Sequence, residues 1–191
     1  LDHELERRTK KFGEQKDLGA SAVVIDPTTG AVRAMVSLPD YSANSFGQGI
    51  GQKEYEKLIN NPANPLLNRT IQGQYPPGSS IKPSLAAAGL QDGIISASTT
   101  MTTPEAIMIG QFRFPDWKLH GLTNTRQAIA ESNDIFFYAV GGGWEERRVK
   151  GLGIERMNYF FDLFGFGKKS EIDLPGEYSG LLGDPEWKKE Q

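Results

Sequence analysis

The chain of 191 residues is 38% hydrophobic and 24% charged, which is typical of a soluble globular domain with a sizeable core. Its net charge of −3 comes without a long basic run, so the charge pattern gives no indication of nucleic-acid binding. The lack of cysteine excludes disulfides, thiolate chemistry and a cysteine-based zinc site, and no apolar run reaches the roughly 18 residues of a membrane span.

The start of the chain predicts a helix, a hairpin and a second, shorter helix. Apolar residues on one helical face predict an entry helix within residues 1–12. Two strand-like runs, residues 20–26 and 31–37, are joined by a turn with proline early and glycine last, which predicts a β-hairpin. Residues 39–46 then read as a loop, and residues 53–59 as a short helix.

The rest of the chain alternates irregular stretches with helices. Residues 92–103 predict loop and short extended pieces, and residues 112–121 are aromatic and irregular. Residues 125–132 predict a helix that runs into a polar Ser-Asn-Asp set, with residues 135–140 as its apolar continuation. The aromatic face of a helix over residues 154–164 predicts packing rather than a cofactor contact.

The best catalytic candidate is the stretch Tyr75 to Pro83. Its two prolines keep the backbone extended and Gly78 allows a sharp pivot, so Ser79 is expected at or near the N-cap of the small-residue helix that follows. Unpaired N–H groups in the first helical turn favour an alkoxide and the oxyanion it creates. Lys82 lies one turn further on the same face, and a neutral lysine amine can take the proton of a serine nucleophile.

Two features of this stretch leave its interpretation open. Pro83 requires the helix to start close to Ser79, yet proline also disfavours the α conformation at Lys82. A bare Ser-x-x-Lys is also compatible with an ordinary N-cap serine and a solvated lysine, so the motif depends on its context.

A second motif supplies that context. Ser132-Asn133-Asp134 has the form Ser-x-Asn/Asp, in which the hydroxyl can relay a proton between Lys82 and a leaving amine. Its third residue can hydrogen-bond Lys82 and the amide of a substrate. Residues 42–44 match the same pattern, but they precede Ser79 and fall in a predicted loop, so we discard them.

With these motifs the chain resembles the transpeptidase domain of a class B penicillin-binding protein, most like the elongation-type penicillin-binding protein 2. The aspartate at the third position of the second motif is similar to this group rather than to the division-type relatives. The residues that carry the resemblance run along nearly the whole chain in family order: Asp26 to Val32, Ala34 to Ser37, Asn68-Arg69, Tyr75 to Pro83, Asp116-Trp117-Lys118, Glu131 to Tyr138, Gly165-Phe166-Gly167 and Ile172-Asp173-Leu174.

The resemblance implies an α+β fold of the β-lactamase/transpeptidase type, with an antiparallel sheet covered by helices. It also implies a peptidoglycan D,D-transpeptidase that works through a serine acyl-enzyme and is a penicillin target, with no cofactor. In that scheme Ser79 is the nucleophile, Lys82 its general base, Ser132 the proton relay and Asp134 an orienting partner. The implied partners are peptidoglycan stem peptides, β-lactam antibiotics and a membrane glycosyltransferase of the elongation machinery.

The chain departs from the family in lacking the third motif, Lys-Thr/Ser-Gly, since Lys169-Ser170-Glu171 has no glycine and falls too early. We therefore expect residues 1–191 to be the N-terminal part of the transpeptidase domain, without its later strands. By the resemblance, the parent protein is anchored at the extracytoplasmic face of the membrane by a segment absent from this chain. We expect these residues alone to acylate poorly, because losing one oxyanion donor costs about 100- to 1,000-fold in rate.

Some members of the penicillin-binding protein 2 group carry zinc near the Asp-Trp-Lys and second-motif region, where Asp116 and His120 lie in this chain. The thiolate of such a site has no counterpart here, because the chain has no cysteine. The sequence therefore predicts no metal site, with His120 as a hydrogen-bonded structural histidine.

Three alternatives have distinct signatures. A serine β-lactamase or β-lactam sensor shares Ser79, Lys82 and the second motif, but a β-lactamase turns a cephalosporin over continuously. A Ser-His-Asp hydrolase fits poorly, since the only two histidines, His3 and His120, lack a catalytic context. A non-catalytic cell-wall scaffold module would make Ser79 dispensable for cell shape.

Overall fold

Two units make up the part of the chain that the computed structural model describes, residues 19–190. The first unit holds the described residues up to Tyr75 together with Glu171–Tyr178, and the second holds Pro76–Ser170 and the described residues from Ser179 onward. The entry helix expected within residues 1–12 lies outside the described residues. Among residues 19–190, no helix combines the length and the apolar character needed to cross a lipid bilayer.

The predicted hairpin is confirmed in the first unit. Strands β1 (Ala20–Ile25) and β2 (Val32–Leu38) pair antiparallel, with Ala20 opposite Leu38. Gly30 closes the turn at a φ of +73°, a backbone conformation that glycine adopts without steric cost, and its N–H donates to the Asp26 carbonyl at 2.8 Å. The turn therefore depends on the proline-to-glycine spacing seen in the sequence.

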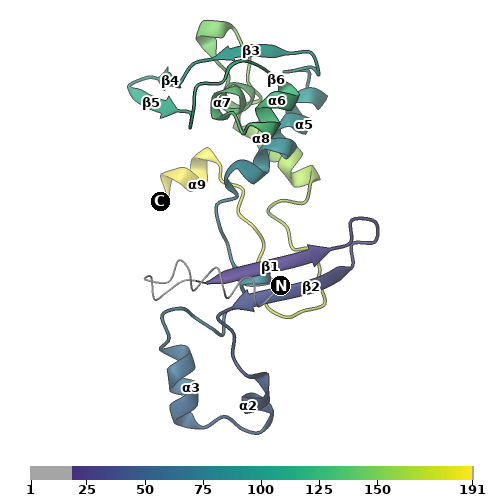
Figure 1. Cartoon of the computed structure of the whole chain (residues 1–191), viewed down its shortest axis with the longest axis vertical. Helices are drawn as coiled ribbons and strands as arrows, with labels where there is room; N and C mark the ends of the chain where they lie inside the picture. Colours follow the sequence, from purple (N-terminus) through teal and green to yellow (C-terminus); the bar gives the residue numbers. More distant parts are fainter. Residues whose placement is uncertain (1–18, 191) are drawn as a thin grey trace. The chain divides into compact units, whose positions relative to one another are not determined.

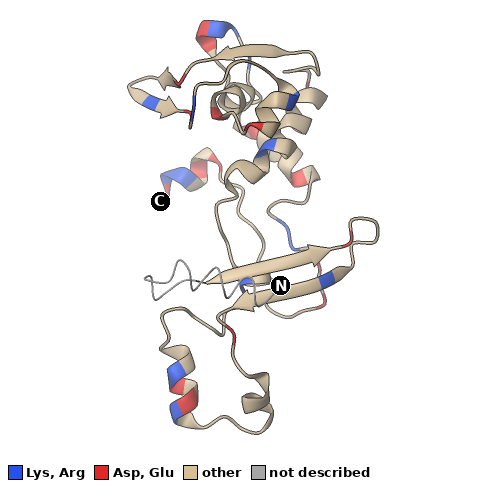
Figure 2. Ribbon diagram, in the orientation of Figure 1, with Lys and Arg blue, Asp and Glu red and all other residues tan. Residues whose placement is uncertain are grey.

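Three short helices follow the hairpin: α2 (Ala43–Gly47), α3 (Gln52–Ile59) and α4 (Arg69–Gln72). The expected helix over residues 53–59 is confirmed as α3, and the ribbon in Figure 2 shows acidic and basic residues interspersed along it. The prediction of a loop through residue 46 was wrong at its end, where α2 forms. Ring contacts account for α2, because Phe46 packs edge-on against Tyr41 at 5.2 Å and Tyr55 at 6.5 Å between centroids.

The second unit combines helices with two antiparallel strand pairs, β3 with β6 and β4 with β5. The expected irregular stretch at residues 112–121 was wrong at its start, where β5 pairs with β4. The elements of the second unit in chain order are the 3₁₀ turn η1 (Gly78–Ile81), α5 (Lys82–Gln91), β3 (Thr100–Thr103), β4 (Ala106–Ile109), β5 (Phe112–Pro115), β6 (Gly121–Asn124), α6 (Thr125–Ala130), α7 (Asp134–Gly142), the 3₁₀ turn η2 (Glu145–Arg147), α8 (Gly153–Leu163) and α9 (Pro185–Lys189).

Helix α7 is the centre of the core in this unit. Its side chains Ile135, Phe136 and Val140 are fully buried, and α5, α6 and α8 pack around it (Figure 1). Each buried side chain of this size contributes about 1.5–3 kcal/mol to the free energy of unfolding. Gly89 lets α5 approach closely, because a Cβ there would lie 2.8 Å from a methyl of Val140. The predicted α+β class is confirmed, with its antiparallel pairing distributed over three two-stranded sheets in the described chain.

Only one face of α8 packs as the sequence predicts. Phe160 is buried and Met157 lies against the same core, whereas Tyr159 and Leu163 are at least half exposed. The prediction that the aromatic residues of this helix pack in the core is therefore correct for one face of α8 and wrong for Tyr159.

A crossing of two backbone segments in the second unit leads to a stability prediction. A Cβ on Gly151 would lie 2.1 Å from the nitrogen of Gly143 and 2.5 Å from the carbonyl carbon of Gly142, which are backbone atoms that cannot rotate away. Gly151→Ala is expected to lower the free energy of unfolding by about 1–3 kcal/mol or more, measured by denaturant and thermal unfolding. Gly142→Ala is the matched control, because a Cβ there meets no atom within 4 Å; equal stability of the two variants would contradict the crossing.

Candidate active site

Ser79 lies in a 3₁₀ turn immediately before α5 rather than at the N-cap of α5 itself. Gly78 takes a φ of +56°, and the N–H of Lys82 donates to the Ser79 carbonyl, closing one tight turn. The α-helix begins at Lys82, whose φ of −58° and ψ of −39° are helical although Pro83 follows. Because Pro83 falls in the first turn, its missing N–H removes no helical hydrogen bond, and this resolves the conflict seen in the sequence.

The Lys82 side chain is buried and surrounded by oxygen atoms of the second motif. Its Nζ donates to the Ser132 carbonyl at 2.8 Å and to the Ser132 hydroxyl at 3.0 Å, and it contacts Asp134 Oδ1 at 2.5 Å. The ring of Phe137 lies 5.8 Å from the ammonium nitrogen. The alternative of a solvated lysine is therefore wrong, since only 6% of the residue is exposed.

The Ser79 hydroxyl lies outside this hydrogen-bonded cluster. Ser79 is exposed, and among the described residues its hydroxyl is hydrogen-bonded neither to Lys82 nor to Ser132. In a 3₁₀ turn side chains three residues apart share one face, so Ser79 and Lys82 lie on the same side of η1. The structure thus brings three of the four predicted residues into contact and sets the fourth one turn away, while their catalytic roles stay predictions.

Ser132 holds its two oxygens toward Lys82 through an unusual backbone conformation. It has a φ of +54° between α6 and α7, in the left-handed region that residues other than glycine rarely adopt. Such a conformation costs on the order of 1–3 kcal/mol and persists only where the surrounding contacts fix it. Here the contacts are those of the segment that follows, which begins with Asn133.

Asn133 is a residue of this site that sequence reasoning missed. It is fully buried, its Oδ1 accepts from the Phe136 N–H at 2.8 Å, and its Nδ2 donates to Thr103 and Thr123 hydroxyls at 2.9 and 3.4 Å. Asparagine is a favoured N-cap, and its place immediately before an apolar helix was the available signal. The amide links α7 to both strands of the β3–β6 pair.

Asp116 provides a second cap at the same helix end. Its Oδ2 accepts from the Ile135 N–H at 3.2 Å, and its Oδ1 accepts from the Trp117 N–H at 2.8 Å. These bonds satisfy an N–H of the first turn of α7 that has no partner within the helix. Asp116 therefore fixes the loop before β6 against the start of the helix that carries Asp134.

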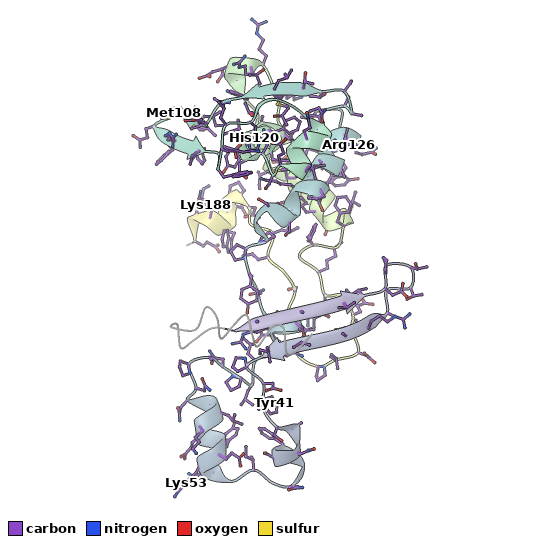
Figure 3. All side chains as sticks on the ribbon, in the orientation of Figure 1. Tyr41, Lys53, Met108, His120, Arg126 and Lys188 are labelled. Atoms are coloured by element: carbon purple, nitrogen blue, oxygen red, sulfur yellow. The ribbon has the colours of Figure 1, made fainter. Side chains whose placement is uncertain are left out.

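His120 lies within the second unit, its side chain fully buried, whereas Met108 lies at the outer edge of β4 (Figure 3). The Nδ1 atom of His120 contacts Glu131 Oε2 at 3.1 Å, and the Nε2 atom of His120 lies 3.4 Å from Asp116 Oδ1 without a hydrogen bond. Within the described part of the chain no group of three or more histidine, cysteine, aspartate or glutamate side chains is arranged to hold a metal ion. The described residues around His120 include no thiolate, so they lack the donor set that the resemblance associates with zinc.

Electrostatic contacts tie the loop after β5 to the residue that precedes Ser132. The hydrogen bond from Lys118 and then that from His120 lower the pKa of Glu131, and the indole N–H of Trp117 donates to the Glu131 carbonyl at 3.1 Å. Burial raises the pKa of Tyr138, with smaller contributions from the charges of Asp134 and Asp116. Near neutral pH the site therefore has an ionised Glu131 and an uncharged Tyr138 phenol.

Known proteins match most of this chain in sequence. A family model described as "Penicillin binding protein transpeptidase domain" matches residues 20–191. The chain is 42% identical over 170 residues to the peptidoglycan D,D-transpeptidase MrdA of Acinetobacter baumannii, an alignment that covers 87% of this chain and 24% of that protein. The chain thus spans about a quarter of the length of this curated relative.

Solved structures agree with the sequence matches. Penicillin-binding protein 2 in its complex with MreC from Helicobacter pylori is 36% identical with a TM-score of 0.80, over 98% of this chain and 34% of that one. A structure on the coordination of polymerisation and crosslinking by a peptidoglycan synthase complex is 32% identical with a TM-score of 0.79, over 96% of this chain and 31% of that one. The fold of the described residues is therefore shared with proteins of this kind.

Proposed function

The chain belongs to the penicillin-binding protein transpeptidase domain family, and from this membership we propose that it is the N-terminal part of a D,D-transpeptidase domain in a longer peptidoglycan cross-linking enzyme. The observation that carries the proposal is the buried Lys82 amine in contact with both Ser132 and Asp134. Family membership supports the reaction class, and this contact supports the choice of residues.

The first half of the proposed reaction forms an acyl-enzyme. The Ser79 Oγ attacks the carbonyl carbon of the D-Ala-D-Ala amide of a stem peptide, while neutral Lys82 accepts the hydroxyl proton. The N–H of Ser79 stabilises the oxyanion of the tetrahedral intermediate. The C–N bond then breaks, and the proton passes from Lys82 through the Ser132 hydroxyl to the nitrogen of the departing D-alanine.

The second half transfers the acyl group. The amine of a neighbouring stem peptide attacks the ester carbonyl and loses a proton to Lys82 through Ser132. The bond between the acyl carbon and Ser79 Oγ then breaks, and Lys82 returns the proton to this oxygen, which regenerates the hydroxyl. Asp134 and the Ser132 carbonyl hold the Lys82 amine in one place through both halves. A short fixed path between amine and hydroxyl is what repeated proton transfer requires.

The remaining part of the site is proposed to lie in the longer protein. The Lys-Thr/Ser-Gly motif of the family does not occur in the sequence, and the matched region makes up only 24% of one relative and 34% of another. That motif would supply the anchor for the substrate carboxylate and the strand with the second oxyanion donor. The proposed activity is therefore a property of the longer protein.

The same family membership suggests partners and location. Substrates would be peptidoglycan stem peptides, with β-lactams as mimics that acylate Ser79, and a domain that acts on them would lie at the extracytoplasmic face of the cell membrane. A membrane glycosyltransferase and a MreC-like protein are proposed as assembly partners, supported by the complexes in which the solved relatives occur. An anchoring segment would lie outside the 191 residues.

A labelled penicillin tests the proposed function directly. The longer protein is incubated with the label, digested and mapped by mass spectrometry, and the adduct is expected on the peptide that contains Ser79. A chromogenic cephalosporin assay is run alongside the labelling, because a transpeptidase is acylated once and its acyl-enzyme hydrolyses slowly. An adduct on any other residue would overturn the proposed mechanism, and steady cephalosporin turnover would instead indicate a β-lactamase.

A further inference from the structure

We propose that Asn133 is a positioning residue for this reaction, holding the Ser132 carbonyl and Asp134 against the Lys82 amine through its buried hydrogen bonds. The inference rests on the proposed function. Asn133 itself has no contact with Lys82 among the described hydrogen bonds, so it acts through its two neighbours in the chain.

The hydrogen bonds of Asn133 fix the orientation of its amide. The hydroxyls of Thr103 and Thr123 each donate to the Gly121 carbonyl at 3.3 Å, so toward Asn133 they can only accept. The Nδ2 group must therefore face the two threonines, and Oδ1 must face the N–H of Phe136. A flipped amide would place donors against a donor, and the side chain is locked in one arrangement.

The backbone of Asn133 carries this constraint to Ser132. The N–H of Asn133 donates to the Ala128 carbonyl at 2.9 Å, and it shares one planar trans peptide with the Ser132 carbonyl. Because the two groups of such a peptide point in opposite directions, fixing the N–H toward α6 directs the carbonyl to the other side, where it accepts a hydrogen bond from Lys82 Nζ at 2.8 Å. The left-handed φ of Ser132 is the conformation that satisfies both bonds at once.

The side chain of Asn133 carries the constraint to Asp134. As the N-cap of α7, Asn133 sets where the helix begins, and Asp134 is the first helical residue after it. The direction of the Asp134 carboxylate toward Lys82 thus depends on the cap, and the cap in turn is attached to β3 and β6 through the threonines. The proposed site is in this way connected to the strand pair rather than to helices alone.

The test measures acylation of the longer protein by labelled penicillin, separating reversible binding from the first-order acylation constant. Asn133→Ala is expected to lower the acylation constant roughly 10- to 100-fold with a smaller change in binding, because displacing reacting groups slightly has effects of this size. Asn133→Ser keeps a good N-cap but loses the contacts to the threonines, and it should retain an intermediate rate. Thermal unfolding of each variant confirms that the compared proteins are folded.

A double-mutant cycle distinguishes positioning from a general loss of stability. If Asn133 acts through Asp134, the Asn133→Ala effect on the acylation constant should largely disappear in an Asp134→Ala background. If Asn133→Ala does not fold, Thr103→Val with Thr123→Val loosens the same amide from the other side, and a reduced acylation constant is again expected. Unchanged acylation in these variants, or effects that simply add in the cycle, would overturn the positioning role; absence of any label on Ser79 in the unmodified protein would overturn the proposed function instead.

Discussion

Replacing Ser79 with alanine is expected to abolish covalent labelling of the longer protein by penicillin, while its unfolding temperature stays within about a degree of the unmodified protein. The hydroxyl is exposed in the tight turn before α5 and makes no described hydrogen bond that supports the fold. Its removal therefore costs chemistry and little stability. Gel fluorescence after a timed incubation, with intact-mass spectrometry, measures the label.

Ser80 provides the matched control for this experiment. It is the adjacent residue of the same turn, it is also exposed, and its hydroxyl donates to the Pro77 carbonyl at 2.6 Å. Ser80→Ala should retain labelling within a few-fold, because the turn is closed by backbone bonds that do not involve this hydroxyl. Labelling that survives in Ser79→Ala and disappears in Ser80→Ala would identify Ser80 as the nucleophile and contradict the proposed role of Ser79.

Replacing Lys82 with methionine is expected to slow acylation by about 100- to 10,000-fold, the range over which a general base contributes. Methionine fills most of the buried space but cannot take the Ser79 proton. The variant should also lose about 1–3 kcal/mol of stability, because the Ser132 carbonyl and Asp134 lose the amine that donates hydrogen bonds to them. The loss stays moderate since 30% of the Asp134 side chain is exposed and remains solvated.

Lys82→Arg separates the two roles of the lysine. A guanidinium can still pair with Asp134 but stays protonated, so it is no base at any accessible pH. Arginine at this position should therefore recover part of the stability lost in Lys82→Met without recovering the acylation rate. Stopped-flow acylation and thermal unfolding measure the two quantities, and a fast Lys82→Arg variant would rule out the lysine as the base.

Local patterns in the sequence were enough to predict the elements that form from contacts close in the chain. The β1–β2 hairpin depends on a turn whose proline and glycine are visible in residues 27–30, and α3 on one short run of helix formers. The strand β5 was missed because its pairing with β4 across a tight turn defines it, whereas its aromatic sequence shows no regular period. The helix α2 was missed because ring contacts with Tyr55, which no periodicity reports, hold it.

The site was predictable where its residues form motifs, and not where its support is tertiary. The Ser-x-x-Lys and Ser-x-Asp spacings led to Ser79, Lys82, Ser132 and Asp134, three of which the structure brings into contact. The threonine partners of Asn133 lie on two strands, 30 and 10 residues before it in the chain, and no local pattern predicts these contacts. Asp116 was considered for a metal, whereas its place at the start of α7 follows only from the folded chain.

The left-handed backbone of Ser132 also limits which residues evolution can place there. Threonine carries the same hydroxyl, but its branched Cβ fits a φ of +54° poorly. Serine-to-threonine exchange would therefore keep the chemical group and strain the backbone. Asparagine, aspartate and glycine tolerate the conformation and lack the hydroxyl that the proposed relay needs. Among the amino acids with a hydroxyl on Cβ, serine alone meets both demands, and the identity of this residue is set by the shape of the main chain as much as by the proton it would carry.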